Sequence, residues 1–157
     1  MNRKLLLAAA IAAAAVGTVG LLRQGQAPDT AYIDPADKEL VSRGKPVYAQ
    51  HCAACHGANL EGQPEWRKRR ANGRLPAPPH DETGHTWHHP DRVLVDIVKH
   101  GLVPGKTAPD GYQSDMPGYA AALSDLEINA VLAYIKSRWP AEVLEMQKNV
   151  TLQQANK

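Results

Sequence analysis

Cys52, Cys55 and His56 lie together within residues 51–60, which read HCAACHGANL. Cys52 and Cys55 are the only cysteines of the chain, and His56 directly follows the second of them. Residues three and four apart on a helical turn face the same way, so one turn would present two thiols and an imidazole together. Four kinds of site use these groups: a disulfide, a redox dithiol, a zinc site and a covalently attached haem.

Three of these alternatives explain the motif incompletely. A disulfide would close a very small loop, which does little for stability, and would leave His56 without a role. A thioredoxin-like dithiol needs a strand before the motif, whereas the residues before Cys52 have a helical pattern. A zinc site needs a fourth ligand, which one of the other histidines could supply.

Covalent haem attachment uses all three residues of the motif. Cys52 and Cys55 would form thioethers to the two vinyl groups of one porphyrin, and His56 would bind the iron from below the ring. The sequence therefore predicts one haem c, with the two cysteines as its attachment sites and His56 as an axial ligand of its iron.

The second axial ligand must come from the opposite face of the ring, far along the chain. Met1 begins the chain and Met146 follows the last long helical pattern, whereas Met116 lies in a loop 60 residues after His56. Histidine and methionine are a common axial pair for an electron-transfer haem, so we expect Met116 to bind the iron. The alternative is a bis-histidine site using one of His80, His85, His88, His89 and His100.

The first 22 residues have the pattern of a signal peptide or an N-terminal transmembrane anchor. Arg3 and Lys4 precede an uncharged run over residues 5–22, and its 18 residues are near the lower limit of roughly 17 to 25 needed to span a bilayer. The possible cleavage positions, after Gly20 and after Ala27, are both poor. Either outcome carries the rest of the chain across a membrane. We expect it on the periplasmic face of a bacterial inner membrane, anchored or soluble.

The composition suits one globular domain with extensions, since 43% of the residues are hydrophobic and 22% are charged. The absence of Phe and the 12 Pro and 12 Gly residues predict a thin protein core and long loops, which a haem would complete. Without Arg3 and Lys4, 16 basic residues face 16 acidic ones, so the composition gives no support for nucleic-acid binding.

Three helices are predicted from caps and from hydrophobic spacing. The first begins at Asp34 and Pro35 and runs toward Cys52, and Pro46 inside it predicts a kink or a late start. A long wrapping loop covers residues 57–89, and the second helix runs from Pro90 to Gly101.

The third helix follows a second loop, residues 102–123, and has the clearest signal. Ser124 and Glu127 form a capping box, after which apolar residues recur at helical spacing up to Trp139. We expect residues 141–149 to add a helical turn or two, and residues 153–157 to be frayed.

Together these motifs resemble a class I cytochrome c of the small bacterial monohaem type, from Val41 to Trp139. The resemblance is carried by RGKPVYAQHCAACHG, PPHDETGHTWHHPD, SDMPGY and LSDLEINAVLAYIKSRWP. It implies an all-α fold of three main helices, with long loops wrapping one covalently bound haem. It also implies that the first and last helices cross near Gly44, Tyr48 and Tyr134. Pro46 departs from the helix-forming residue usual in the family.

We therefore expect four parts in the chain: a signal peptide or anchor (1–22), a linker (23–35), a cytochrome c domain (36–140) and a C-terminal extension (141–157). The resemblance implies a one-electron carrier rather than an enzyme. The expected donor is a quinol-oxidising complex or a dehydrogenase, and the expected acceptor is a terminal oxidase or reductase. The alternatives are a tethered subunit of a larger oxidase or dehydrogenase assembly, and a haem enzyme or gas-binding protein in which the methionine is displaced.

Two further clusters suggest additional roles. Residues 85–89, HTWHH, could bind copper or zinc, but Pro90 favours extended backbone there, so we expect Trp87 or a histidine to pack at the haem edge or to bind a propionate. The basic residues Arg67, Lys68, Arg69, Arg70 and Arg74 predict a solvated charged loop, with propionate pairing and docking of an acidic redox partner as alternatives.

Overall fold

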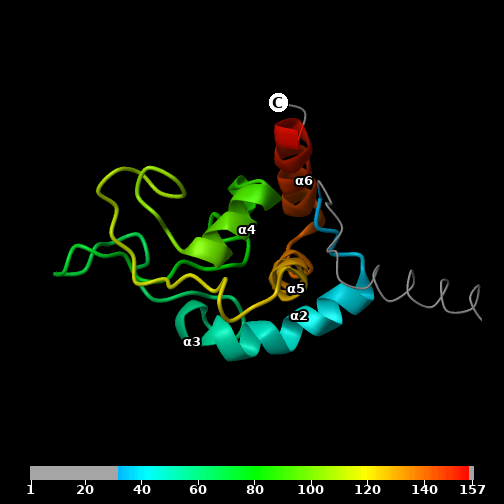
Figure 1. Ribbon diagram of the computed structural model, residues 1–157, viewed down its shortest axis with the longest axis horizontal. Helices are drawn as coiled ribbons and strands as arrows, with labels where there is room; N and C mark the ends of the chain where they lie inside the picture. Colours follow the sequence, from blue (N-terminus) through cyan, green and yellow to red (C-terminus); the bar gives the residue numbers. More distant parts are fainter. Residues whose placement is uncertain (1–31, 156–157) are drawn as a thin grey trace, which may run out of the picture.

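Helices and long loops make up residues 32–155, which are the residues that this computed structural model describes (Figure 1). The helices are α2 (Lys38–His51), α3 (Ala53–His56), the short 3-10 helix η2 (Thr86–His88), α4 (Asp91–His100), α5 (Asp125–Lys136) and α6 (Ala141–Ala155). No strand occurs in this part of the chain, where the one bridge of β type joins Pro104 and Ala108. The predicted all-α class is therefore confirmed.

Helix α2 begins later than the sequence predicted. Its N-cap is Asp37, whose carboxylate accepts hydrogen bonds from the backbone N–H groups of Glu39 and Leu40, both at 3.0 Å. The expected cap, Asp34, instead accepts from the N–H of Ala36 in the preceding turn. The prediction of a late start near Pro46 is also wrong, because the helix continues through Pro46 to His51. Pro46 is exposed, so water can bind the carbonyl that loses its helical donor.

The crossing of α2 and α5 forms where the resemblance placed it. Gly44 is buried, and a Cβ atom there would overlap the carbonyl oxygen of Ala130 and lie 2.9 Å from the Cβ of Tyr134. One turn later, the rings of Tyr48 and Tyr134 pack with their centroids 5.4 Å apart. A side chain at position 44 would therefore force the two helices apart.

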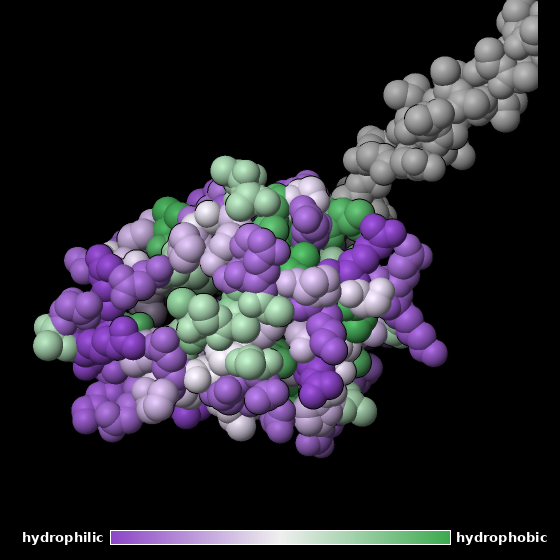
Figure 2. All heavy atoms as spheres, turned by 90° about the horizontal axis from the view of Figure 1, so that it is seen from below, coloured by the Kyte–Doolittle hydropathy of each residue, from purple (hydrophilic) through white to green (hydrophobic). Residues whose placement is uncertain are grey.

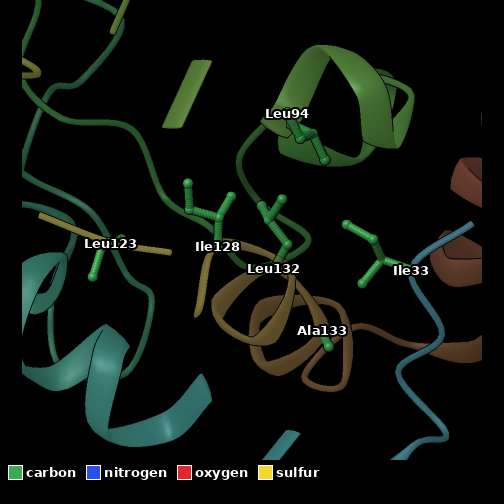
Figure 3. Close-up of a cluster of buried hydrophobic side chains, with 6 residues drawn as sticks. All are labelled: Ile33, Leu94, Leu123, Ile128, Leu132 and Ala133. Carbon is green, nitrogen blue, oxygen red and sulfur yellow. The ribbon is translucent and has the colours of Figure 1, made fainter. Parts of the chain in front are cut away.

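Helix α5 is the centre of the core, and its predicted capping box between Ser124 and Glu127 is present. On one side, Ile128, Leu132 and Ala133 pack with Leu94 of α4 and with Ile33 and Leu123 (Figure 3). On the other side, Val131 and Ile135 pack with Tyr48, Leu60, Trp139 and Val143. Burial on both sides explains why this helix has the clearest hydrophobic signal in the sequence.

Helix α4 has the predicted bounds, with Pro90 as its N-cap and Gly101 as its C-cap, where φ is +74°. Helix α6 is much longer than the predicted turn or two, and residues 153–155 are helical rather than frayed. Its buried side chains, Val143, Gln147 and Thr151, recur every four residues. Because two of the three are polar, the hydrophobic pattern did not show this helix.

A buried polar network fastens α6 to the body of the protein. Lys136, which is fully buried, donates to both carboxylate oxygens of Asp91 at 2.8 and 2.9 Å. Gln147 of α6 donates to the same carboxylate at 2.7 Å, and Thr151 accepts from the N–H of Asp91. The N–H of Ile33 donates to Asp91 as well, at 2.6 Å. One carboxylate therefore joins the N-terminal approach, α4, α5 and α6.

The predicted signal peptide or anchor (1–22) and most of the linker (23–35) lie outside the described residues. Among the helices that are described, none combines the length and the apolar character needed to cross a membrane.

Candidate functional site

The cysteine motif lies on helical backbone, as the sequence predicted. The N–H of Cys52 donates to Tyr48 O at 2.9 Å, which ends α2, and the N–H groups of Cys55 and His56 donate back to Cys52 O at 3.1 and 2.9 Å. The two cysteines form no disulfide; Cys52 is partly buried and Cys55 is exposed. The approach to the motif is helix α2, so it does not have the strand that a thioredoxin-like dithiol requires.

His56 is buried, with 7% of its surface exposed, and its ring is held in one orientation. Its Nδ1 lies 2.8 Å from the carbonyl oxygen of Pro78. A carbonyl can only accept, so Nδ1 carries the proton and the lone pair of Nε2 is left for a metal. Burial also lowers the pKa of His56, so its imidazole is neutral at neutral pH, which is the form that binds iron.

Tyr48 and Gly57 shape the turn that leaves the motif. The Tyr48 hydroxyl donates to Gly57 O at 2.9 Å, and burial raises its pKa, so it stays protonated as a donor. Gly57 has φ +83°, and a side chain there would also collide with Glu61. These two residues fix where the chain turns away after His56.

His80 lies on the same side of the site as His56. The two rings are stacked with centroids 3.8 Å apart and planes 17° apart, a separation that leaves no room for an iron atom between them. His80 therefore does not fit the opposite-face ligand of a bis-histidine site. Its Nδ1 is buried without a hydrogen-bond partner, and its backbone carbonyl accepts from Trp139 Nε1 at 2.7 Å.

Met116 is half-buried in a segment that is fastened to the rest of the site. The N–H groups of Tyr119 and Ala120 donate to Val98 O and Lys99 O at the end of α4, at 2.9 and 3.1 Å. The Tyr119 hydroxyl donates to His51 O at 2.7 Å, directly before the motif. The segment that carries Met116 is thus joined to the residue preceding Cys52, while the coordination of iron by Met116 stays a prediction.

The HTWHH cluster is held by aromatic contacts. Trp87 stacks on His88 with centroids 3.7 Å apart and packs against the cluster around Tyr48, and its Nε1 donates to Glu82 O. His85 stacks on Trp66 and meets His89 edge to face. Nowhere in residues 32–155 do three or more His, Cys, Asp or Glu side chains group so that they could hold a metal ion. These contacts fix the cluster in place, and its role at the haem edge stays a prediction.

The basic residues 67–70 lie on an exposed loop at the end of the molecule away from α6, where hydrophilic side chains gather (Figures 1 and 2). Arg67 lies over Trp66 at 4.0 Å, and Arg70 donates to Gln63 Oε1 at 2.6 Å. A hollow of about 280 Å³ lies at this loop and is lined by Gln63, Pro64, Glu65, Lys68, Arg69, Arg70 and Pro76. It contains no residue of the cysteine motif, so it is not part of the predicted haem site.

The residues present fit a covalently bound haem. One helical turn presents two cysteines and a neutral imidazole whose tautomer is fixed, and no disulfide joins the cysteines. Sequence reasoning found these donors from their spacing but missed Pro78 and Tyr119, which act through a carbonyl and a hydroxyl group. Both residues lie far from the motif in the sequence, and no pattern of residue spacing predicts their contacts with it.

A protein-family model described as Cytochrome c matches residues 41–139, well over half of the chain. Its bounds coincide with those of the resemblance drawn from the motifs. No curated protein and no solved structure matches the chain.

Proposed function

This chain belongs to the cytochrome c family, whose members bind haem c covalently and transfer electrons, and from that premise we propose that it is a one-electron carrier between respiratory complexes. Cys52 and Cys55 would hold the haem by thioethers, and His56 and Met116 would be its axial ligands. When bound, the haem supplies one iron-centred redox couple.

The protein side of this proposal is ligation and burial. Pro78 holds His56 by its Nδ1, so that Nε2 keeps a constant direction. A methionine thioether favours Fe(II) relative to nitrogen donors, so Met116 would raise the reduction potential. Protein ligands at both axial positions leave no place for a substrate, which favours an electron carrier over an enzyme.

We further propose that the protein works on the periplasmic face of a bacterial inner membrane. The pattern of residues 1–22 supports export, by a cleaved signal or a retained anchor. In this setting the donor would be a quinol-oxidising complex or a dehydrogenase, and the acceptor a terminal oxidase or reductase.

One observation carries the proposal: two cysteines that form no disulfide share a helical turn with an imidazole whose Nδ1 lies 2.8 Å from Pro78 O. The test is the mass and the visible spectrum of the protein made in a host with working cytochrome maturation. A thiol adds across a vinyl group without losing an atom, so the expected mass is that of the processed chain plus one haem. Colourless protein with free thiols would refute the proposal, and Cys52→Ala with Cys55→Ala should abolish stable loading.

The methionine assignment has its own test. Met116→Ala should keep the covalent haem, lose the weak long-wavelength band of a methionine-ligated ferric haem and lower the potential. Met146→Ala is the matched control, because Met146 is exposed on α6. A wild-type ferric protein that is five-coordinate and high-spin would instead favour a haem enzyme or gas-binding protein. Co-purification with a larger complex after mild detergent extraction would favour a tethered subunit.

A further inference from the structure

Residues 74–78 contact one predicted axial ligand, His56, and the residue next to the other, Met116. Pro78 O accepts the hydrogen bond from His56 Nδ1 at 2.8 Å. Four residues earlier, the Arg74 guanidinium forms an ion pair with Asp115, the residue directly before Met116. One short segment therefore joins the two sides of the site, although the paired residues are 22 and 41 positions apart in the sequence.

This segment is well fixed at both of its ends. The backbone of Ala77 is bound twice by Gln63, at 2.9 Å through its carbonyl and at 3.3 Å through its N–H. Arg74 O accepts from the N–H of Arg70 at 2.9 Å. Pro76 is buried, and Pro76 and Pro78 have restricted φ angles, so the segment has little freedom to change shape.

Met116 lies between two attachments of its own segment. On the C-terminal side, Tyr119 is bound to Val98 O and His51 O. On the N-terminal side, Asp115 pairs with Arg74, and Tyr112 lies under the Arg69 guanidinium, 5.6 Å from the ring centroid to Cζ. Both contacts on the N-terminal side come from the basic loop, and the arginine of the ion pair belongs to the fixed segment 74–78.

We propose that Arg74 is a positioning residue for Met116: its ion pair with Asp115 holds the methionine segment against residues 74–78, which also orient His56. This rests on the proposed function, because it takes Met116 as the second axial ligand. Weakening the pair makes the methionine easier to displace. The Arg74 and Asp115 side chains are 39% and 51% exposed, so the expected effect is modest, about two- to fivefold in a competition constant.

The experiment is a titration of the ferric haem-loaded protein with imidazole, which competes with Met116 for the iron. Binding is measured by the loss of the methionine band. Arg74→Gln and Asp115→Asn should each bind imidazole about two- to fivefold more tightly than the wild type. The double variant should bind imidazole no more tightly than either single variant, because all three lose the same contact. Arg74→Lys, which keeps the charge, should recover part of the wild-type value.

Two control variants separate this role from a general effect of charge. Asp110→Asn removes an exposed acid from the same loop, and Arg138→Gln removes an exposed base, and neither residue forms an ion pair with the described part of the chain. Both should leave imidazole binding unchanged. The difference in imidazole affinity between the wild type and Asp115→Asn should also become smaller at high salt, because the ion pair is exposed.

Two results would overturn the proposal and are distinguishable. If wild-type protein has the methionine band but Arg74→Gln and Asp115→Asn bind imidazole as the wild type does, the positioning role is wrong and the proposed function stands. If the wild type has no methionine band, the ligand assignment fails and the positioning role fails with it.

Discussion

Two ion pairs of this protein have opposite surroundings, one buried and one exposed. Lys136 and Asp91 pair where α4, α5 and α6 meet, with side chains 0% and 4% exposed. Arg74 and Asp115 pair between two loops, with side chains 39% and 51% exposed. The chemistry of the two pairs is alike, so the difference in their consequences comes from the surroundings.

The buried pair belongs to a region that the chain stabilises by itself. Burial has removed both charges from water, and the Asp91 carboxylate accepts from Ile33, Lys136 and Gln147. Losing one partner would leave the other charge without compensation. The exposed pair joins the loop that carries Met116 to the segment that contains Pro78. Water can replace either partner there, so the pair affects where a loop lies much more than whether the protein folds.

The largest effect is expected when the buried pair is broken. Lys136→Met keeps the volume but leaves the Asp91 carboxylate without its cation, and we expect the free energy of unfolding to fall by about 3 to 5 kcal/mol. Urea denaturation of the haem-loaded protein measures it. Lys106→Met, an exposed lysine of the second loop, should change stability by less than about 0.5 kcal/mol. A loss below about 1 kcal/mol for Lys136→Met would remove the contrast between the pairs.

A smaller loss is expected when α6 is detached from the same carboxylate. Gln147 is fully buried and donates to Asp91 and to His89 O, at 2.7 and 3.1 Å. Gln147→Leu leaves His89 O without this donor and the Asp91 carboxylate with one donor fewer, so we expect a loss of about 1 to 3 kcal/mol. Gln153→Leu, on the exposed part of α6, is the matched control and should be nearly neutral. Equal effects at both positions would mean that the network does not hold the helix.

The exposed pair should behave in the opposite way in the same denaturation experiment. Asp115→Asn should cost less than about 1 kcal/mol of stability while it changes the competition between imidazole and Met116. Lys136→Met should cost several times more stability and leave the methionine band intact, because its hydrogen-bond network includes neither His56 nor Met116. A stability loss for Asp115→Asn as large as that for Lys136→Met would show that the loop is part of the folding core.

What the sequence could predict follows the same division. Residue patterns within single helices were enough to predict the helical turn of the cysteine motif, the capping box of α5 and the bounds of α4. The crossing at Gly44 and Tyr48 followed from the family resemblance. The extent of α6 was missed, because Gln147 and Thr151 face the interior for hydrogen bonds rather than for hydrophobic burial.

Contacts between distant residues had no signal in a single sequence. Pro78 with His56, Lys136 with Asp91 and Arg74 with Asp115 are each joined by the folded chain, across 22 to 45 positions. The start of α2 was misplaced for a local reason. Asp34 and Asp37 are both good N-caps by residue type, so residue type alone does not decide which of them begins the helix.

The smallest expected effect concerns a third charged contact, which is exposed and local. Glu127 accepts from the side chain and the N–H of Ser124, at 2.7 and 2.8 Å, and these hydrogen bonds lower its pKa. A carboxyl with a lowered folded pKa contributes stability that is present above its ordinary value of 4.5 and lost as the pH falls through the folded value. Glu127→Gln can keep the capping hydrogen bond without titrating. The stability difference between wild type and Glu127→Gln should therefore decline as the pH is lowered from neutral to about 3, which urea denaturation at several pH values measures. If the stability difference between wild type and Glu127→Gln does not change with pH, the charge of Glu127, unlike that of the buried Lys136–Asp91 pair, contributes nothing to the fold.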